Sequence, residues 1–348
     1  ILMTYHFRNL IFEGGGVKGI AYVGALQVLE EKGILPEITR VGGTSAGAIN
    51  AVLLGLNFTP QETLRILNKL DFKKFMDDDV GALRDTKRLL NEFGWHKGDF
   101  FRKWISDLIK KKTGNRDATF ADVQAQKDQK GFRNMYFMGT NLSTHFAEVF
   151  SFERTPRICL ADAVRISMSI PLFFASHRSP RGDIYVDGGV LDNYPVKLFD
   201  RQRYLAPDNL ATHGVETDYY AKHNRKLERK NLNISPYIFN KETLGFRLDS
   251  AREIAVFRDQ AEPVHERIDD FGSYTLNIVK TFLDAQSNQH LHGDDWQRTI
   301  YVDTLGVKTT EFKITDAKKK ALVHSGRKST ETYLKWFDTP ASKPANLV

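Results

Sequence analysis

Ser45 lies in the sequence Gly43-Thr44-Ser45-Ala46-Gly47, a G-x-S-x-G motif. Where such a motif links a strand to a helix, the serine is pushed out above the sheet, and small flanking residues let the backbone turn sharply. The N-terminus of the helix also favours negative charge that develops nearby. A short expected strand at residues 38–41 precedes this motif and an Ala- and Leu-rich segment follows it, so the sequence predicts that Ser45 is a nucleophile.

A second group of small residues is the sequence GGGVKG at residues 14–19. Successive glycines leave backbone N–H groups unshielded, as an oxyanion hole requires. Gly14, Gly16 and Gly19 also match the dinucleotide fingerprint G-x-G-x-x-G. A dinucleotide site needs an acidic residue at the end of the next strand, roughly 20 residues on. Here Glu37 precedes that strand, so an oxyanion hole is the favoured interpretation and a cofactor site is the alternative.

Lys18 is expected in the first turn of a helix, where its positive charge opposes the helix dipole. One interpretation of this unfavourable placement is that Lys18 contacts a substrate phosphate. The other is that it is a solvated lysine or the partner of a structural carboxylate.

A third motif, Asp187-Gly188-Gly189, follows the apolar residues 184–186. An aspartate at the end of a strand is expected to face the same sheet edge as Ser45 and could act as its base. A lone Asp-Gly-Gly is more often a turn. The order Ser, Asp, His of α/β-hydrolases also leaves a conventional triad open, with His213, His223 or His265 after Asp187.

Hydrophobic periodicity indicates the elements that would position these motifs. Short strands are expected at residues 10–12 and 38–41, and helices over residues 22–29 and 46–56. This alternation of strand and helix predicts a parallel sheet covered by helices. The remaining expected elements up to residue 205 are a helix that starts at 59–62, helices at 99–112 and 162–168, and strands at 134–142, 147–152 and 184–186.

The composition and the hydrophobic periodicity of the sequence change near residue 205. Residues 206–235 are polar and basic, which predicts a surface loop or linker. Helical patterns return over residues 248–285, with a break at Pro263, and a strand at 299–302 precedes a final helix at 315–337. We therefore expect a catalytic core at 1–205 and a mainly helical region at 206–348. Within the core, the polar stretch 76–98 is expected to form a mobile excursion.

Composition limits the classes of protein. The chain has 348 residues, of which 41% are hydrophobic, and a net charge of +7. Cys159 is the single cysteine, which excludes an intramolecular disulfide and favours a reducing compartment. No run approaches the roughly 18 apolar residues of a membrane span, and no signal peptide is expected at the start. Basic residues cluster at 110–112 and at 222–230; the second cluster is a candidate membrane-facing patch.

The motifs GGGVKG, GTSAG and DGG, in that order, resemble the patatin-like phospholipase family. Ser167-Met168-Ser169-Ile170-Pro171 and Asp192-Asn193-Tyr194-Pro195 add to the resemblance, which is strong over residues 8–200. It implies a three-layer α/β/α sandwich around a largely parallel sheet. It also implies that Ser45 is the nucleophile, that Asp187 is the general base, and that the amides of Gly14, Gly15 and Gly16 form the oxyanion hole.

The reaction implied by the resemblance is hydrolysis of an acyl ester of a phospholipid or lysophospholipid through an acyl-enzyme, at a membrane surface. No cofactor, calcium or other metal is expected, because the sequence shows no zinc or calcium ligand pattern. Acyl transfer to another acceptor and a silent lipid-binding regulatory module are the alternatives. We expect a cytoplasmic or peripheral membrane protein, or a secreted effector, with no nucleic-acid partner; an activating partner stays open.

Overall fold

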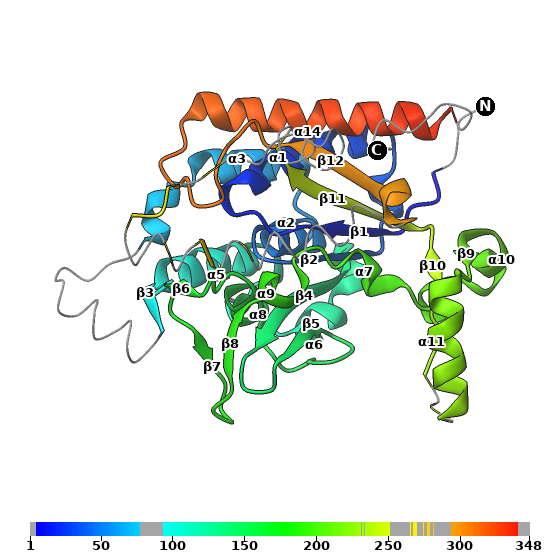
Figure 1. Ribbon diagram of the computed structural model, residues 1–348. Coiled ribbons are helices and arrows are strands. Elements are labelled where there is room, and N and C mark those ends of the chain that lie inside the picture. Colours follow the sequence, from blue (N-terminus) through cyan, green and yellow to red (C-terminus); the bar gives the residue numbers. More distant parts are fainter. Residues whose placement is uncertain are drawn as a thin grey trace.

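A computed structural model describes residues 5–76, 93–230, 232, 234–250 and 294–339, and a few residues between 265 and 281. Its central feature is an eight-stranded sheet in the order β12-β11-β1-β2-β4-β8-β7, with β5 also paired to β4 (Figure 1). The strands are β1 (Asn9–Phe12), β2 (Arg40–Gly43), β4 (Asn134–Asn141), β5 (Phe146–Ser151), β7 (His177–Arg178), β8 (Ile184–Asp187), β11 (Thr243–Asp249) and β12 (Thr299–Asp303). The strands from β12 to β4 are parallel, whereas β5 and β8 run antiparallel to β4, and β7 to β8.

Helices flank this sheet, which confirms the expected α/β architecture. The α-helices are α1 (Ala21–Glu31), α2 (Ala46–Gly55), α3 (Pro60–Lys69), α5 (Asp99–Thr113), α6 (Phe120–Ala125), α7 (Lys127–Lys130), α8 (Leu160–Ser167), α9 (Gly189–Asp192), α10 (Leu210–His213), α11 (Asp218–Arg229) and α14 (Asp316–Phe337). The 3₁₀ helices are η1 (Gly16–Ile20), η2 (Leu35–Glu37), η3 (Phe72–Phe75), η4 (Val196–Phe199), η5 (Gln202–Tyr204), η6 (Pro207–Asn209) and η7 (Asp294–Arg298). Two short ribbons pair β3 (Gly94–His96) with β6 (Leu172–Phe174), and β9 (Gly214–Val215) with β10 (Phe239–Asn240).

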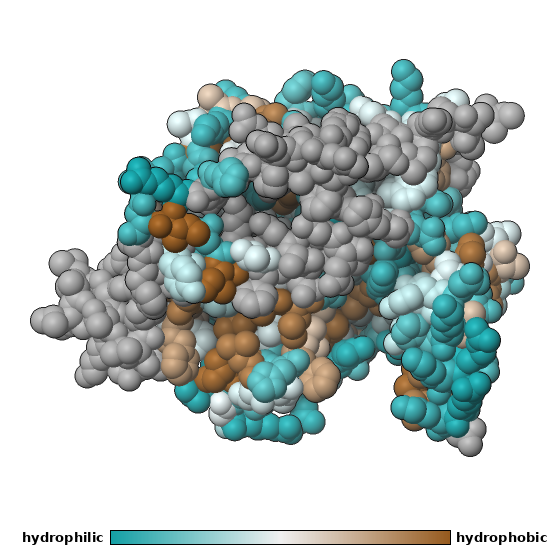
Figure 2. All heavy atoms as spheres, viewed as in Figure 1, coloured by the Kyte–Doolittle hydropathy of each residue, from teal (hydrophilic) through white to brown (hydrophobic). Residues whose placement is uncertain are grey.

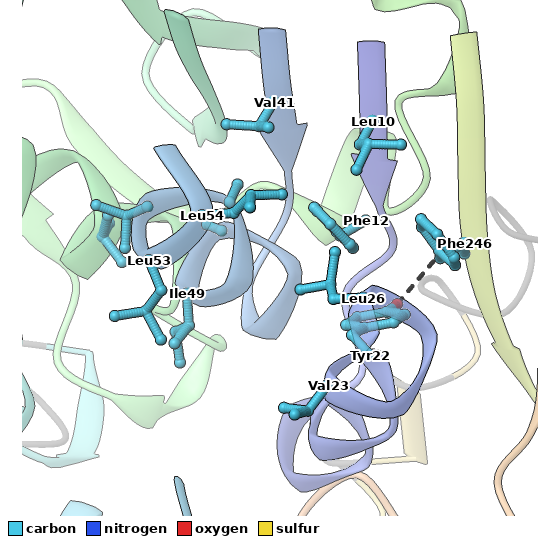
Figure 3. Close-up of a cluster of buried hydrophobic side chains, with 14 of the residues drawn as sticks. Leu10, Phe12, Tyr22, Val23, Leu26, Val41, Ile49, Leu53, Leu54 and Phe246 are labelled. Atoms are coloured by element: carbon cyan, nitrogen blue, oxygen red, sulfur yellow. Dashed lines mark hydrogen bonds between the residues drawn. The ribbon is translucent and has the colours of Figure 1, made fainter. Parts of the chain in front are cut away.

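Both faces of the sheet are buried, because side chains alternate along each strand. On β1, Leu10 and Phe12 belong to the large core, whereas Ile11 belongs to a smaller core on the other face. Figure 3 shows the large core, in which α1 and α2 pack against β1, β2 and β11. The smaller core is covered by the turns η4 and η5, through Val196, Phe199 and Tyr204. The sheet is therefore shielded from water around the strand ends that carry the motifs.

The final helix, α14, lies directly on α1 (Figure 1). Two glycines make the crossing close. A Cβ atom on Gly24 would overlap the carbonyl oxygen of Val323, and one on Gly326 would overlap the carbonyl oxygen of Ala21. The C-terminal helix thus contacts the backbone of the first long helix, and the fit depends on the absence of side chains at these two positions.

Residues beyond 205 also complete the sheet. The strand expected at 299–302 is confirmed as β12, but β11 at residues 243–249 was not expected, and the helical pattern expected from residue 248 is wrong for 248–249. Leu244, Phe246 and Leu248 alternate as in a strand. Arg247 lies between them and is fully buried, so the strand is buried on both faces although its sequence contains a charged residue. The rest of the expected helical stretch, including Pro263, lies mostly outside the described residues, as do residues 77–92 of the expected excursion. The division at residue 205 stays a prediction about folding units.

The prediction of a loop over residues 206–235 is wrong for 218–229, which form α11. Thr217 caps this helix through a hydrogen bond from the amide of Tyr220. Its buried positions are Tyr220 and Asn224, and the Asn224 side chain bonds both the N–H and the C=O of Tyr237. Because a polar asparagine replaces the apolar residue of a normal amphipathic stripe, hydrophobic periodicity does not reveal the helix.

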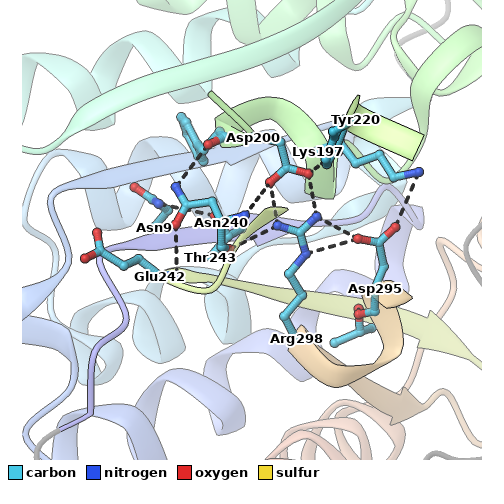
Figure 4. Close-up of polar contacts among 11 residues, drawn as sticks. Asn9, Lys197, Asp200, Tyr220, Asn240, Glu242, Thr243, Asp295 and Arg298 are labelled. Atoms are coloured by element: carbon cyan, nitrogen blue, oxygen red, sulfur yellow. Dashed lines mark hydrogen bonds and ion pairs between the residues drawn. The ribbon is translucent and has the colours of Figure 1, made fainter. Parts of the chain in front are cut away.

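A buried ionic group anchors this part of the chain (Figure 4). The guanidinium of Arg298 pairs with Asp200 at 2.6 Å and with Asp295 at 2.6 Å. All three side chains are buried, and Tyr220 of α11 donates a hydrogen bond to Asp200. Burial of these charges is tolerated because each is paired and hydrogen-bonded. The group joins η4, α11 and the start of β12.

We expect Gly24→Ala and Gly326→Ala each to destabilise the protein. In an exposed helix, alanine is more favourable than glycine by about 1 kcal/mol, so a loss of stability would have to come from forcing α1 and α14 apart. Urea unfolding measures the change in free energy, with Gln27→Ala on the same helix as a control that adds no buried atoms. Stabilisation by both glycine variants would contradict the close contact between the two helices.

Candidate active site

Ser45 occupies a strained turn between β2, which ends at Gly43, and α2, which begins at Ala46. Its backbone has φ 54° and ψ −123°, a conformation that costs about 1–3 kcal/mol for a residue with a side chain. The flanking glycines allow the turn. A Cβ on Gly43 would lie 2.5 Å from the carbonyl carbon of Gly47, and one on Gly47 would overlap the carbonyl oxygen of Phe12. The structure thus gives a steric reason for each glycine of the motif.

Asp187 ends β8, and strand register brings it to the level of the Ser45 turn. Although both residues follow the ends of strands, the two strands run in opposite directions, because β8 is antiparallel to β4 and β4 is parallel to β2. β4 extends past the end of β2: Gly43 pairs with Phe137, and Asp187 pairs with Gly139, two residues further along β4. Asp187 therefore arrives from the opposite direction at the level that Ser45 reaches by its turn.

Both side chains are enclosed, with 4% of Ser45 and 2% of Asp187 exposed. Burial raises the pKa of Asp187 from 3.8 to about 7, and the hydrogen bond from the Gly189 amide and the nearby Ser45 hydroxyl offset only part of this rise. The amide of Gly189 donates to Oδ1 at 2.7 Å. Oδ2 is buried and, among the described residues, has no partner with full hydrogen-bond geometry. The Ser45 hydroxyl is near this carboxylate, but its Oγ bonds Sδ of Met168 at 3.5 Å.

The segment that follows α8 supports both residues. Ser167 Oγ accepts a hydrogen bond from the amide of Ser45 at 3.0 Å, and the carbonyl of Ser169 accepts one from the amide of Asp187 at 2.8 Å. Met168 lies between these two contacts. Residues 167–171 are part of the family resemblance, but the sequence alone predicts no role for them. A run of small polar residues at a helix end was the only signal, and it does not reveal which backbone groups these residues bind.

Arg165 in turn fixes this segment. Its buried guanidinium donates to Ser169 Oγ at 2.5 Å and to the carbonyls of Lys97 and Ala175 at 2.6 and 3.0 Å. The last two groups flank the β3–β6 ribbon. These three acceptors are neutral oxygens, and burial is the dominant cause of the raised pKa of Asp187.

The glycine loop lies against the Ser45 turn. A Cβ on Gly14 would be 3.1 Å from Cβ of Ser45. The amide of Gly14 donates to the carbonyl of Asn193 at 3.0 Å, so it is occupied. The amides of Gly15 and Gly16, by contrast, have no acceptor among the described residues, and Gly16 has a φ of +56°. Of the three expected oxyanion donors, the structure leaves Gly15 and Gly16 available to a ligand.

Lys18 lies in η1 and not in the first turn of α1, which begins at Ala21, so the expected conflict with the α1 dipole does not arise in that form. A Cβ on Gly15 would be 3.4 Å from Cε of Lys18, which places the lysine stem beside the glycine loop. The half-buried side chain has no hydrogen-bond or ion-pair partner within the described ranges. Glu37 lies in η2, before β2, so the loop lacks the acidic partner of a dinucleotide site.

The residue before the loop, Glu13, is held by the C-terminal strands. Its buried carboxylate accepts a hydrogen bond from the amide of Leu248 at 2.7 Å and lies 3.9 Å from Nε of Arg247. Arg247 also pairs with Asp249 at 2.9 Å. These contacts fix the end of β1 against β11, directly before the glycines.

The histidines considered for a triad bind elsewhere. Nδ1 of His213 lies 2.8 Å from Glu242, and Nδ1 of His223 lies 2.8 Å from the carbonyl of Tyr219. His265 is exposed. Within the part of the chain that is described, none of these three bonds Ser45 or Asp187. The same residues contain no group of three or more His, Cys, Asp or Glu side chains that could hold a metal ion, and no helix long and apolar enough to cross a membrane.

Comparison with known proteins agrees with this geometry. The model of the patatin-like phospholipase family matches residues 10–200, which is more than half of the chain. The chain belongs to the patatin-like phospholipase family. The match includes Ser45, Asp187, the glycine loop and the supporting segment 167–169, but not β11, β12 or α14.

Individual proteins similar to this chain extend the comparison. The uncharacterized protein YqhO of Bacillus subtilis is 31% identical over 93% of this chain and 97% of its own length. Lysophospholipase NTE1 of Candida glabrata is 29% identical over 54% of this chain, which spans only 9% of that protein. The crystal structure of VipD from Legionella pneumophila shares the fold, with a TM-score of 0.57 and 19% identity over 95% of this chain and 67% of that one.

The raised pKa of Asp187 predicts a pH-dependent stability difference. The folded state disfavours the charged carboxylate, so this group costs stability progressively as pH rises from 3.8 to about 7. Asp187→Asn removes that cost. Relative to wild type, the variant should gain stability over this range and level off above pH 7, with a gain on the order of 4 kcal/mol. Urea unfolding at several pH values measures it, with the exposed Asp128→Asn as control. A difference independent of pH would contradict the raised pKa.

Proposed function

We propose that the protein is a serine acyl-hydrolase that cleaves acyl esters of phospholipids or lysophospholipids with a Ser45–Asp187 dyad. The observation that carries the proposal is the placement of Asp187, a buried carboxylate with a pKa of about 7, beside a serine on a strained strand-to-helix turn. At its ordinary pKa an aspartate is too weak a base for a serine hydroxyl. A pKa near the working pH makes it an effective general base.

The proposed reaction begins with a rotation of the Ser45 hydroxyl from Met168 Sδ to Oδ2 of Asp187, the oxygen without a geometric partner. Asp187 takes the hydroxyl proton as Oγ attacks the acyl carbon, and the carbonyl oxygen becomes an oxyanion. The free amides of Gly15 and Gly16 would bind this charge. The ester C–O bond then breaks, and the leaving alcohol takes the proton from Asp187, which leaves an acyl-enzyme. Asp187 next takes a proton from water as the water oxygen attacks the acyl carbon. The bond to Oγ breaks, Asp187 returns the proton to Oγ of Ser45, and the fatty acid is released.

Lipid is the proposed source of the acyl group. Relatives of this chain carry the names lysophospholipase NTE1 and probable lipid hydrolase 463L, the latter from Invertebrate iridescent virus 6 with 26% identity over 57% of this chain. Lys18 supports a phosphorylated substrate, because its ammonium group has no acidic partner among the described residues and its stem lies beside Gly15. We therefore propose that Lys18 contacts the substrate phosphate next to the oxyanion hole.

Loss of either dyad member should abolish hydrolysis. Ser45→Ala and Asp187→Asn should each lower kcat on a soluble short-chain ester by at least about 10³-fold, and the double variant should be no worse, since the two residues act as one unit. A soluble ester separates chemistry from membrane binding. His213→Ala and His223→Ala, the matched controls, should keep most activity. A folded histidine variant as inactive as Ser45→Ala would favour a triad, and an active Asp187→Asn would exclude Asp187 as the base.

The pH profile should report the same carboxylate. Asp187 acts as a base only when ionised, so kcat/KM on the soluble ester should rise with pH through a single ionisation near pH 7 and then level off. Excess EGTA should leave the profile unchanged, because the scheme uses no calcium. A profile already flat from pH 5 upward would show that the base has an ordinary carboxylate pKa.

A further inference from the structure

Two neighbouring hairpins extend beyond the candidate active site (Figure 1). One is the turn of residues 142–145 between β4 and β5, and the other is the turn of residues 179–183 between β7 and β8. Hydrogen bonds join them: the amide of Leu142 donates to the carbonyl of Ile184 at 2.8 Å, and the amide of Ile184 donates to Ser143 Oγ at 3.0 Å. The two turns are therefore joined into one unit, the hairpin tip.

The hairpin tip lies on the same edge of the sheet as the dyad. β8 runs from the tip at Ile184 to Asp187, a path of about 10 Å at roughly 3.3 Å per residue. β4 passes the level of Ser45 and continues to Asn141, where the first turn begins. The helix α9, which follows Asp187 and carries the exposed Leu191, packs against β4 and β5. The tip is thus the outer border of the site.

Large apolar side chains are exposed on this tip. Phe146 is 70% exposed and Leu142 is 42% exposed. The turn is held in shape by Asn141, whose Oδ1 accepts hydrogen bonds from the amides of Ser143 and Thr144 at 3.0 and 3.2 Å. A turn fixed in this way keeps Phe146 in water. Exposed apolar groups gathered at one place mark a contact with another molecule or a membrane.

Basic side chains accompany the apolar ones. Arg178 and Arg181 are exposed on the second hairpin, and α11 extends toward the same side of the molecule in Figure 1. In Figure 2, α11 is a largely teal column, while brown side chains gather over the region of β8 and α9. The exposed basic residues of α11 and its end are Lys222, Arg225, Lys226, Arg229 and Lys230.

Nearby acidic residues cancel the charge of the hairpins but not that of α11. On the hairpins, Glu148 and Asp183 balance the charges of Arg178 and Arg181. On α11, Asp218 lies at the first turn and Glu228 is the only acidic residue in the last two turns, so the five basic residues there leave a net positive charge. The outer side of the site therefore combines projecting apolar groups on the hairpin tip with an excess of positive charge on α11.

We propose that this side is the surface that docks on an anionic lipid bilayer, with Phe146 and Leu142 inserted among the lipids and the basic residues of α11 on the headgroups. This inference rests on the proposed function, because a lipid hydrolase must meet its substrate in a membrane. The positive charge favours an anionic membrane as the binding partner, because each Lys or Arg near an anionic surface strengthens binding by about fivefold. Full burial of one phenylalanine strengthens it by about tenfold or more.

Vesicle binding tests the docking surface apart from catalysis. The Ser45→Ala protein serves as background, so that no lipid is consumed, and co-sedimentation is measured with phosphatidylcholine vesicles that contain either no phosphatidylserine or about 30%. Phe146→Ser and Leu142→Ser are the test variants. Phe152→Ser is the matched control, because Phe152 is also 42% exposed and adjoins β5, but follows the opposite end of that strand. A charge variant replaces the five basic residues of α11 with Gln.

We expect Phe146→Ser to weaken binding to the anionic vesicles by about tenfold or more, Leu142→Ser to weaken it less, and Phe152→Ser to leave it unchanged. The charge variant should lose binding mainly at low salt and only on anionic vesicles. Wild-type binding by Phe146→Ser, an equal loss with Phe152→Ser, or no binding by the parent protein would overturn the docking surface. Failure of the proposed function is separate, since it would appear as an inability of the wild-type protein to cleave the soluble ester.

Discussion

The candidate site depends on burying the carboxylate of Asp187 without pairing it with a positively charged side chain. Asp187 is enclosed, and the raised pKa that makes it useful as a base comes from that burial. A guanidinium in contact with it would lower the pKa and remove its basicity. Arg165 lies in the same region, yet three neutral oxygens accept its hydrogen bonds. The positive charge therefore supports the backbone near Asp187 and does not act as its counter-ion.

The same arrangement explains why one short segment matters so much. Ser167 Oγ and the carbonyl of Ser169 accept hydrogen bonds from the amides of Ser45 and Asp187, so the two candidate residues share one support. Placement within a fraction of an ångström is what an acyl-transfer site requires. The strained backbone of Ser45 is tolerated because the contacts of its neighbours fix the conformation of the turn.

Residue types and their spacing predicted that Ser45, the glycine loop and Asp187 belong to one candidate site, and the structure places these three features close together. The residue types did not predict how Asp187 reaches Ser45. Strand direction is a property of the whole sheet, and an antiparallel β8 reads in the sequence like a parallel one. β11 was not predicted because Arg247 is buried beside Asp249 and Glu13, and Glu13 lies 234 positions before Arg247 in the sequence. Periodicity records which side chains are apolar, not which charged ones are paired in the interior.

The family motifs end near residue 200, yet the site does not end there. Glu13, the last residue before the glycines, is fixed by the amide of Leu248 on β11. The side chain of Leu248 also borders Gly15, where a Cβ would lie only 2.6 Å from its Cδ1. Gly16 is confined in the same way by the carbonyl of Thr309, which follows β12 and leads into α14. The C-terminal residues therefore border the loop that carries the amides of Gly15 and Gly16. The composition of the sequence changes near residue 205. The sheet and the candidate site nevertheless include residues on both sides of that position.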